Sequence, residues 1–273
     1  MQVRQRIRKF LESFDLYFKI KYSDFYLKNI LRKHDSTHPI LKLEKVYYLS
    51  LVKNIKKDKK IIFDVGANEG FISSFFLDEN FKVVAIEPDP RNQKILAARF
   101  HHQKHFKLIK KGVSDEQKRA PFFIHNRNSS LNTFSSKWKE SIESKNQDDG
   151  FSKKQEFIEL ITLDQIIKQE GIPSFIKIDV EGHELEVING LNTKIPLISF
   201  EANFPEFKEE TMLIINKLEQ ICGESDFNFS INYKLAFLEF VNKSKLEKEL
   251  NKINEEVCLE IICRMSNYVQ FFN

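Results

Sequence analysis

The chain has 273 residues, of which 41% are hydrophobic and 30% are charged, a composition that excludes an intrinsically disordered protein and suits one catalytic-sized domain with additions at its ends. The net charge of +4 conceals an asymmetry, because residues 1–60 hold 16 of the 43 basic residues but only 6 of the 39 acidic ones.

Residues 1–58 are predicted to form a basic helical extension. Apolar side chains recur there at helical spacing, at Val3, Ile7, Phe10, Leu11, Phe14, Tyr17 and Phe18. This stripe favours packing on the catalytic core or on a second copy of the chain in a homodimer. The alternative is peripheral contact of the basic face with an anionic membrane or an acidic substrate.

We expect a cytoplasmic protein. The first 22 residues are interrupted by charges every few positions, and no apolar run approaches the roughly 20 residues that cross a bilayer. The three cysteines fit neither a metal spacing nor an even disulfide framework, which favours a reducing compartment. No pattern of interleaved aromatic and basic residues indicates a nucleic-acid partner.

Residues 59–273 are predicted to form the catalytic domain, because strands and helices alternate along them. Strands are expected at 60–65, 82–87, 106–113, 174–180 and 197–203, and helices at 69–79, 90–103, 162–171, 183–190 and 207–221. Short extra strands at 120–125 and 155–162 flank a polar stretch, 125–150, predicted to be a loop that covers the site. The last segments suggest an antiparallel pair that finishes a doubly wound, mostly parallel, Rossmann-like α/β sheet.

The stretch IIFDVGANEG at 61–70 marks the first strand-to-helix turn, where such sheets bind ligands. Gly66 and Gly70 allow close approach of the backbone, and Asn68 tolerates the dihedral angles between them. A dinucleotide would favour G-x-G-x-x-G, whereas here the turn reads G-A-N-E-G, from Gly66 through Ala67 and Asn68, and Glu69 would put a negative charge near the phosphate. Asp64 suits the ammonium group of S-adenosylmethionine (SAM) better than a phosphate.

The next two strands end in further candidate cofactor ligands. Glu87, followed by Pro88, lies 23 residues after Asp64, where an acid can accept both ribose hydroxyls. Ser114 and Asp115 end the third strand, where an adenine edge could be held. Glu87 alone does not separate SAM from NAD.

Four blocks, FDVGANEGFIS, AIEPDP, TLDQII and FIKIDVEGHELEVINGL, followed by ISFEAN, resemble the FkbM-type family of SAM-dependent methyltransferases over about residues 60–205. The resemblance implies a class I methyltransferase fold, with a seven-stranded sheet in the order 3-2-1-4-5-7-6. It also implies methyl transfer to a hydroxyl of a sugar or small metabolite. By the same resemblance Asp64, Gly66, Asn68, Gly70 and Glu87 bind SAM, and residues 128–131 (NSSL) lie near the cofactor.

Asp179 is the first candidate for the reactive centre, because it ends a strand at the edge where the cofactor methyl should lie, on the same side as Lys177. His183 is a second candidate as a general base, since its ordinary pKa is near neutrality. Glu201, predicted to end the neighbouring strand at LISFE, is expected beside Asp179, so that crowding raises the carboxyl pKa values. Glu181 and Glu184 are read as acids of the first helical turn.

The sequence thus predicts a SAM-dependent O-methyltransferase that acts on a carbohydrate, glycolipid or small metabolite. Two alternatives remain: an NAD(P)-dependent oxidoreductase of the same fold, and a SAM-binding module without catalysis. No metal is assigned, because Asp179 and Glu201 lack a third ligand in the sequence pattern.

Overall fold

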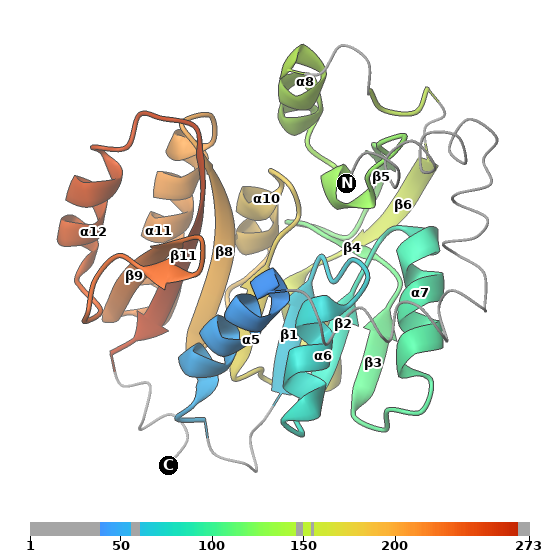
Figure 1. The fold of residues 1–273 in the computed structure, drawn as a ribbon, viewed down its shortest axis with the longest axis horizontal. Helices are drawn as coiled ribbons and strands as arrows, with labels where there is room; N and C mark the ends of the chain where they lie inside the picture. Colours follow the sequence, from blue (N-terminus) through green and yellow to red (C-terminus); the bar gives the residue numbers. More distant parts are fainter. Residues whose placement is uncertain (1–38, 56–60, 146–149, 154–155, 267–273) are drawn as a thin grey trace.

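The computed structural model describes residues 39–55, 61–145, 150–153 and 156–266. At its centre is an eight-stranded sheet in the order β10-β9-β11-β8-β7-β1-β2-β3 (Figure 1). Its strands are β1 (Ile61–Val65), β2 (Lys82–Ile86), β3 (Phe106–Ile109), β7 (Phe175–Ile178), β8 (Leu197–Phe204), β9 (Ser225–Ile231), β10 (Lys234–Leu235) and β11 (Val257–Met265).

The predicted fold class is confirmed. Counted as seven strands, β3-β2-β1-β7-β8-β11-β9 follows the expected order 3-2-1-4-5-7-6, and β11 runs antiparallel to both of its neighbours. The count of seven is wrong by one, because β9 returns on itself and adds β10 at the edge. The return is tight because Asn232 and Tyr233 both adopt left-handed backbone angles, with φ of 50° and 62°.

The predicted third strand, 106–113, is two strands in different sheets. β3 pairs with β2, whereas β4 (Gly112–Val113) pairs with β6 (Glu156–Ile161), which also pairs with β5 (Arg119–Phe122). Gly112 makes the second pairing possible, since a Cβ on it would lie 2.4 Å from a methyl group of Leu160. The small three-stranded sheet contributes Gly112, Val113 and Phe122 to the lining of the main cavity described below.

Helices cover both faces of the main sheet. One face carries α5 (Pro39–Val52), α6 (Phe71–Asp78) and α7 (Pro90–Phe100). The other carries α9 (Leu163–Glu170), α10 (Glu184–Asn189), α11 (Lys208–Cys222) and α12 (Lys243–Leu250). Alternation along β1 places Ile62 in the first core and Phe63 in the second, and both side chains are fully buried. Burial on both faces explains why this strand reads as a continuous apolar run.

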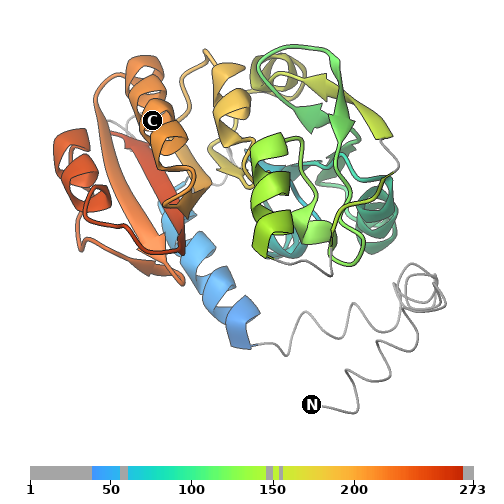
Figure 2. The ribbon, with the colours of Figure 1, turned by 90° about the horizontal axis from the view of Figure 1, so that it is seen from above.

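The predicted loop at 125–150 is wrong in part, because it contains a 3-10 turn (Ser129–Leu131) and helix α8 (Ser136–Lys145). The helix is anchored mainly by Trp138, whose ring lies 5.9 Å from that of Phe207. Its only large apolar residues are Trp138 and Ile142, and one such pair among charged and polar residues is too little periodicity to predict a helix, so the sequence pattern favoured a loop. Viewed from above, the light green α8 lies between the orange C-terminal elements and the strands of the small sheet (Figure 2).

Helix α5 belongs to the core of the catalytic domain. Tyr47 and Tyr48 are buried, and the ring of Tyr48 packs edge-on to Phe76 at 6.4 Å. The hydroxyl of Ser230 donates to the Tyr47 hydroxyl oxygen at 3.0 Å. The apolar stripe expected from Val3 to Phe18, and any membrane contact through it, lie outside the described residues. In the parts of the chain that the structure describes, every helix is too short or too polar to span a membrane.

Replacing Tyr47 with Phe is expected to lower the free energy of unfolding by about 1–2 kcal/mol, because the buried Ser230 hydroxyl loses its acceptor. Urea denaturation followed by circular dichroism measures this change. Leu43→Ala in the same helix is the control, since Leu43 is 61% exposed and its loss should change the free energy by less than about 0.5 kcal/mol. Equal effects of both substitutions would contradict the packing of α5 on β9.

Candidate active site

A cavity of about 420 Å³ opens at the carboxyl ends of β1, β2 and β7. We call it the main cavity; its volume falls in the range that proteins use for small molecules and cofactors. The β1–α6 turn contributes Gly66, Ala67, Asn68 and Glu69, the end of β2 contributes Glu87 and Pro88, and the end of β7 contributes Asp179 and Glu181. The predicted turn, strand-end acid and reactive-centre residue therefore line one space.

The glycine turn has the backbone that its sequence predicts. Gly66 has a φ of 80°, and a Cβ on it would lie 1.8 Å from the carbonyl oxygen of Asp179. Asn68 takes a φ of 49°. Gly70 has a different role: it lies outside the cavity lining, and its missing side chain leaves room for Leu96 on α7, 2.5 Å from an ideal Cβ. The missing side chain of Gly66 thus allows the ends of β1 and β7 to approach each other. The missing side chain of Gly70 allows α6 and α7 to pack together.

Asp64 is buried just before this turn and does not itself line the main cavity, whose lining begins at the next residue, Val65. The Ser73 hydroxyl donates to its Oδ2 at 2.6 Å, whereas its Oδ1 has no hydrogen-bond partner. The Oδ1 of Asn68 is likewise buried and without a partner. Burial raises the pKa of Asp64, and the neighbouring Lys177 opposes that shift. Buried acceptors are normally hydrogen-bonded, so the two unpartnered oxygens of Asp64 and Asn68 indicate a site for a ligand that donates hydrogen bonds.

Glu87 is fixed by the backbone around it. Its Oε2 accepts from the Asn68 N–H at 2.7 Å, and its Oε1 accepts from the Asp89 N–H at 2.8 Å. Burial raises the pKa of Glu87 to about 8. Glu87 lines the cavity, and each of its oxygens can accept one more hydrogen bond. The carboxylate can therefore bind a ligand with two neighbouring hydroxyls.

The raised pKa of Glu87 makes the stability of the folded protein depend on pH in a defined direction. Its folded-state pKa of about 8 is above the ordinary value of 4.5, so the folded protein binds more protons than the unfolded chain between these values. The stability that Glu87 contributes is therefore present below about pH 4.5 and lost as the pH rises through 8. Urea unfolding of the ligand-free protein at pH 5 and 8 should show a smaller decrease for Glu87→Gln than for the wild type. An unchanged decrease would contradict the raised pKa.

Ser114, Asp115 and His183 lie together but outside the lining of the main cavity. The Ser114 hydroxyl donates to Asp115 at 2.9 Å and lies 3.3 Å from Nε2 of His183. The cavity wall expected from them is supplied instead by Lys111, Phe122, Asn128, Ser129, Ser130 and Asn132. The serine-containing segment named from the family resemblance therefore lines the cavity. The cofactor role of Ser114 and Asp115 stays a prediction.

His183 is buried, and burial lowers its pKa to about 4. It lines a separate pocket, together with Glu186 and Phe207, and does not line the main cavity. A general base works best with a pKa near the operating pH. Asp179, which lines the main cavity, is the better placed of the two predicted bases.

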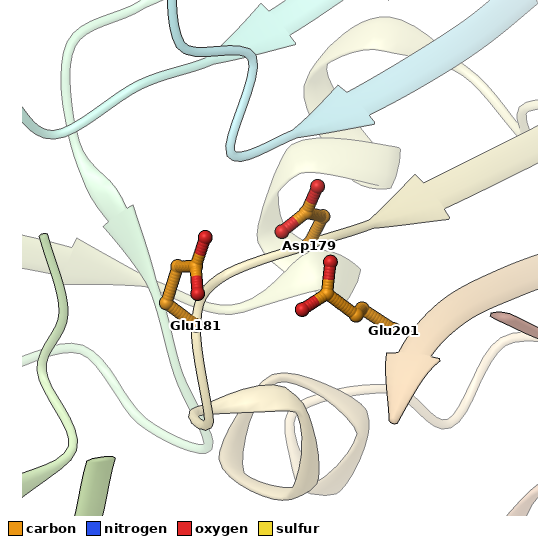
Figure 3. Close-up of side chains that lie close together, drawn as sticks. All are labelled: Asp179, Glu181 and Glu201. Carbon is orange, nitrogen blue, oxygen red and sulfur yellow. The ribbon is translucent and has the colours of Figure 1, made fainter. Parts of the chain in front are cut away.

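Asp179 and Glu201 are brought together by the parallel neighbours β7 and β8, as predicted. Together with Glu181 they form an acidic cluster in which one oxygen of each residue lies within 4.8 Å of the others (Figure 3). Lys177 donates to Asp179 Oδ2 at 2.7 Å, and Asn203 donates to Glu201 Oε1 at 2.8 Å. Burial, followed by the charge of Asp179, raises the pKa of Glu201 well above its ordinary value.

Two details of this region differ from the prediction. Glu201 does not end its strand, because β8 pairs with β11 as far as Phe204. Glu181 is not in a helical turn, since α10 begins at Glu184; it lies in the preceding loop with a φ of 57°. The carboxylate of Glu184 holds this loop by accepting the N–H groups of Val180 and Gly182 at 3.0 and 3.3 Å.

Glu181 is the third carboxylate that sequence reasoning missed, although its position two residues after Asp179 was the available signal. Burial, with the nearby charge of Glu201, raises its pKa well above the ordinary value. Three convergent carboxylates are the type of ligand that Mg²⁺ and Ca²⁺ prefer, and the raised pKa values of Glu181 and Glu201 favour retention of protons on these two acids without a cation. The arrangement can therefore hold a divalent ion or accept a proton from a bound hydroxyl.

The chain was compared with known proteins. Precorrin-6y C5,15-methyltransferase from Geobacter metallireducens GS-15 shares 11% identity and a TM-score of 0.42, over 81% of this chain and 87% of that one. An rRNA methylase from Streptococcus thermophilus shares 9% identity and a TM-score of 0.40, over 84% and 98% of the two chains. No curated protein matches the sequence.

The family comparison is more specific. The family model described as the methyltransferase FkbM domain matches residues 64–230, which is more than half of the chain. The match begins at Asp64 and includes the glycine turn, Glu87 and the acidic cluster. The resemblance read from the sequence is thereby confirmed, and the chain belongs to the family of FkbM methyltransferase domains.

Proposed function

We propose that this methyltransferase uses SAM to methylate a hydroxyl of a carbohydrate, glycolipid or small metabolite. The observation that carries the proposal is the buried Oδ1 of Asp64, which has no partner at the glycine turn. An orphaned carboxylate oxygen fits the ammonium end of an amino-acid-bearing cofactor and not a phosphate. The second orphaned acceptor, Asn68 Oδ1, supports the same reading.

SAM would lie along the main cavity. Asn68, which lines it, and Asp64, buried directly behind Val65 of the lining, would hold the amino-acid end, and Glu87 would accept from the ribose hydroxyls. The methyl end would face Asp179, because the close approach of Gly66 to the Asp179 carbonyl joins the two ends of the site. The acidic lining would neutralise a cofactor that is positively charged at both sulfur and nitrogen.

SAM supplies an electrophilic methyl group on a sulfonium sulfur. The chain aligns an acceptor oxygen with that methyl and excludes water, which is the main source of acceleration in such a displacement. Asp179 would accept the hydroxyl proton of the acceptor whose oxygen takes the methyl group. Lys177 donates a hydrogen bond to Asp179 Oδ2 and so positions the carboxylate. The other oxygen of Asp179, Oδ1, would take the proton.

The NAD(P)-dependent alternative is less well supported. A pyrophosphate at the turn would lie beside Glu69, which lines the cavity, and beside the buried Asp64. Both acids would repel it. The binding-module alternative differs from our proposal only in turnover, so an activity assay separates the two.

Two measurements test the proposal together. Calorimetry with SAM and with NADH should show binding of SAM alone, and preferential binding of NADH would refute the cofactor. Labelled methyl transfer from SAM to glycan and lipid extracts of the producing cell should then give labelled products. SAM binding without transfer to any fraction would favour the binding module.

A further inference from the structure

A second cavity of about 180 Å³ adjoins the main cavity. The two spaces share three lining residues, Glu44, Lys177 and Asp179, so the second reaches Asp179 from the side of β8 and β11. We call it the acceptor cavity. Its volume equals that of about six liquid water molecules, enough for one monosaccharide unit and too small for a nucleotide.

The floor of the acceptor cavity is a row of polar side chains across three strands. Glu201 of β8 lies directly opposite Glu260 of β11, and Glu260 lies opposite Ser230 of β9. Two buried acids directly opposite in an antiparallel pair either repel each other or retain protons, and burial raises the pKa of both, that of Glu260 to about 7. The Oε1 of Glu260 is buried and has no hydrogen-bond partner. The pairing of Glu201 with Glu260, and the unpartnered Oε1 of Glu260, do not stabilise the fold. Such residues are expected where the side chains serve to bind a ligand.

The wall of the cavity joins two parts of the chain that are far apart in sequence. The hydroxyl of Tyr233 in the β9–β10 turn donates to Oε1 of Glu44 on α5 at 2.8 Å. Tyr233 takes a left-handed φ of 62°, which aromatic residues rarely adopt. This backbone angle orients the ring toward α5 and into the lining of the cavity, beside Asn232.

The lining chemistry defines the ligand. Four carboxylates, Glu44, Asp179, Glu201 and Glu260, face one cation, Lys177. Their oxygens accept hydrogen bonds, so they select a ligand rich in donors, and in their ionised form they outnumber the single cation, which disfavours a ligand that carries carboxylate, sulfate or phosphate. Tyr48 and Tyr233 add aromatic surface for the apolar faces of a ring.

We propose that this cavity binds an uncharged, hydroxyl-rich sugar unit as the methyl acceptor, with Glu44 and Tyr233 as specificity-determining residues. This inference rests on the proposed function and adds to it the place and the charge class of the acceptor.

Cys258 offers a way to fill the cavity without touching the cofactor site. It is exposed and lines the acceptor cavity but not the main one. Cys258→Trp should reduce labelled methyl transfer at least about tenfold, because the indole occupies the space of the sugar, while the Kd for SAM stays unchanged. Leu238→Trp is the matched control, since Leu238 is fully exposed and lines neither cavity.

Glycan and lipid extracts of the producing cell are first separated on anion and cation exchangers, and each fraction is assayed with labelled SAM and the three proteins. Most label should enter the neutral fraction, and Cys258→Trp should lose it while Leu238→Trp keeps it. Equal transfer by Cys258→Trp and the wild type would overturn the cavity assignment, and label mainly in a charged fraction would overturn the neutral class. Wild-type SAM binding with no transfer to any fraction would instead refute the proposed function, and this inference with it.

Discussion

Replacing Asp179 with Asn is expected to slow methyl transfer by about 10²–10⁴-fold, the usual contribution of a general base. The substitution removes the proton acceptor that faces both cavities and keeps an oxygen for the hydrogen bond from Lys177. Burial of Lys177 is still compensated, because Asp64 lies directly opposite it on β1. The Kd for SAM should therefore change by less than about threefold.

Single-turnover methyl transfer measures the rate, and calorimetry measures the binding of SAM. Asp78→Asn is the control, since that exposed acid pairs only with Lys45 at 2.6 Å, far from the cavities, and should alter neither value. Full activity of Asp179→Asn would remove Asp179 from the reaction. A loss of SAM affinity as large as the loss of rate would make it a cofactor ligand only.

Replacing Asp64 with Asn is expected to have the opposite signature. SAM binding should weaken about 10–100-fold, which is the value of a hydrogen bond to a charged group. At saturating SAM the rate should fall much less, because Asp64 does not line the cavity that receives the acceptor. The ligand-free protein should melt at an equal or higher temperature, since a buried carboxylate with an orphaned oxygen is replaced by a neutral amide.

Calorimetry and a thermal melt of the same preparations separate these effects. Ser74→Ala on the same helix is a useful control, because its hydroxyl bonds only to the carbonyl of Phe71. A large drop in melting temperature for Asp64→Asn would mean that the acid holds the fold and not the cofactor. Unchanged SAM affinity would refute its role directly.

The parts of the structure that were predictable are those governed by local rules. Buried parallel strands such as β1 and β7 read as apolar runs, and helices between them show amphipathic spacing. The turn at Gly66 was predictable because a positive φ and a close backbone contact both require glycine. The meeting of Asp179 and Glu201 followed from the order of the strands alone.

The parts that were missed depend on contacts across the chain. Nothing local in α5 indicates that Glu44 reaches Tyr233, 189 residues later. Glu260 is an isolated acid in an apolar strand, and only its register with Glu201 shows that it belongs to the site. Helix α8 was missed because its main apolar contact is long-range: the ring of Trp138 packs on Phe207, far away in the sequence.

The central claim is that SAM occupies the main cavity with its amino group at Asp64 and its ribose at Glu87. A crystal structure with S-adenosylhomocysteine, the product of transfer, tests it most directly. We predict density for the amine within hydrogen-bond distance of Asp64 Oδ1 and for the ribose hydroxyls at the Glu87 carboxylate. Density for this nucleoside elsewhere, or a main cavity that stays empty at saturating concentration, would contradict the claim.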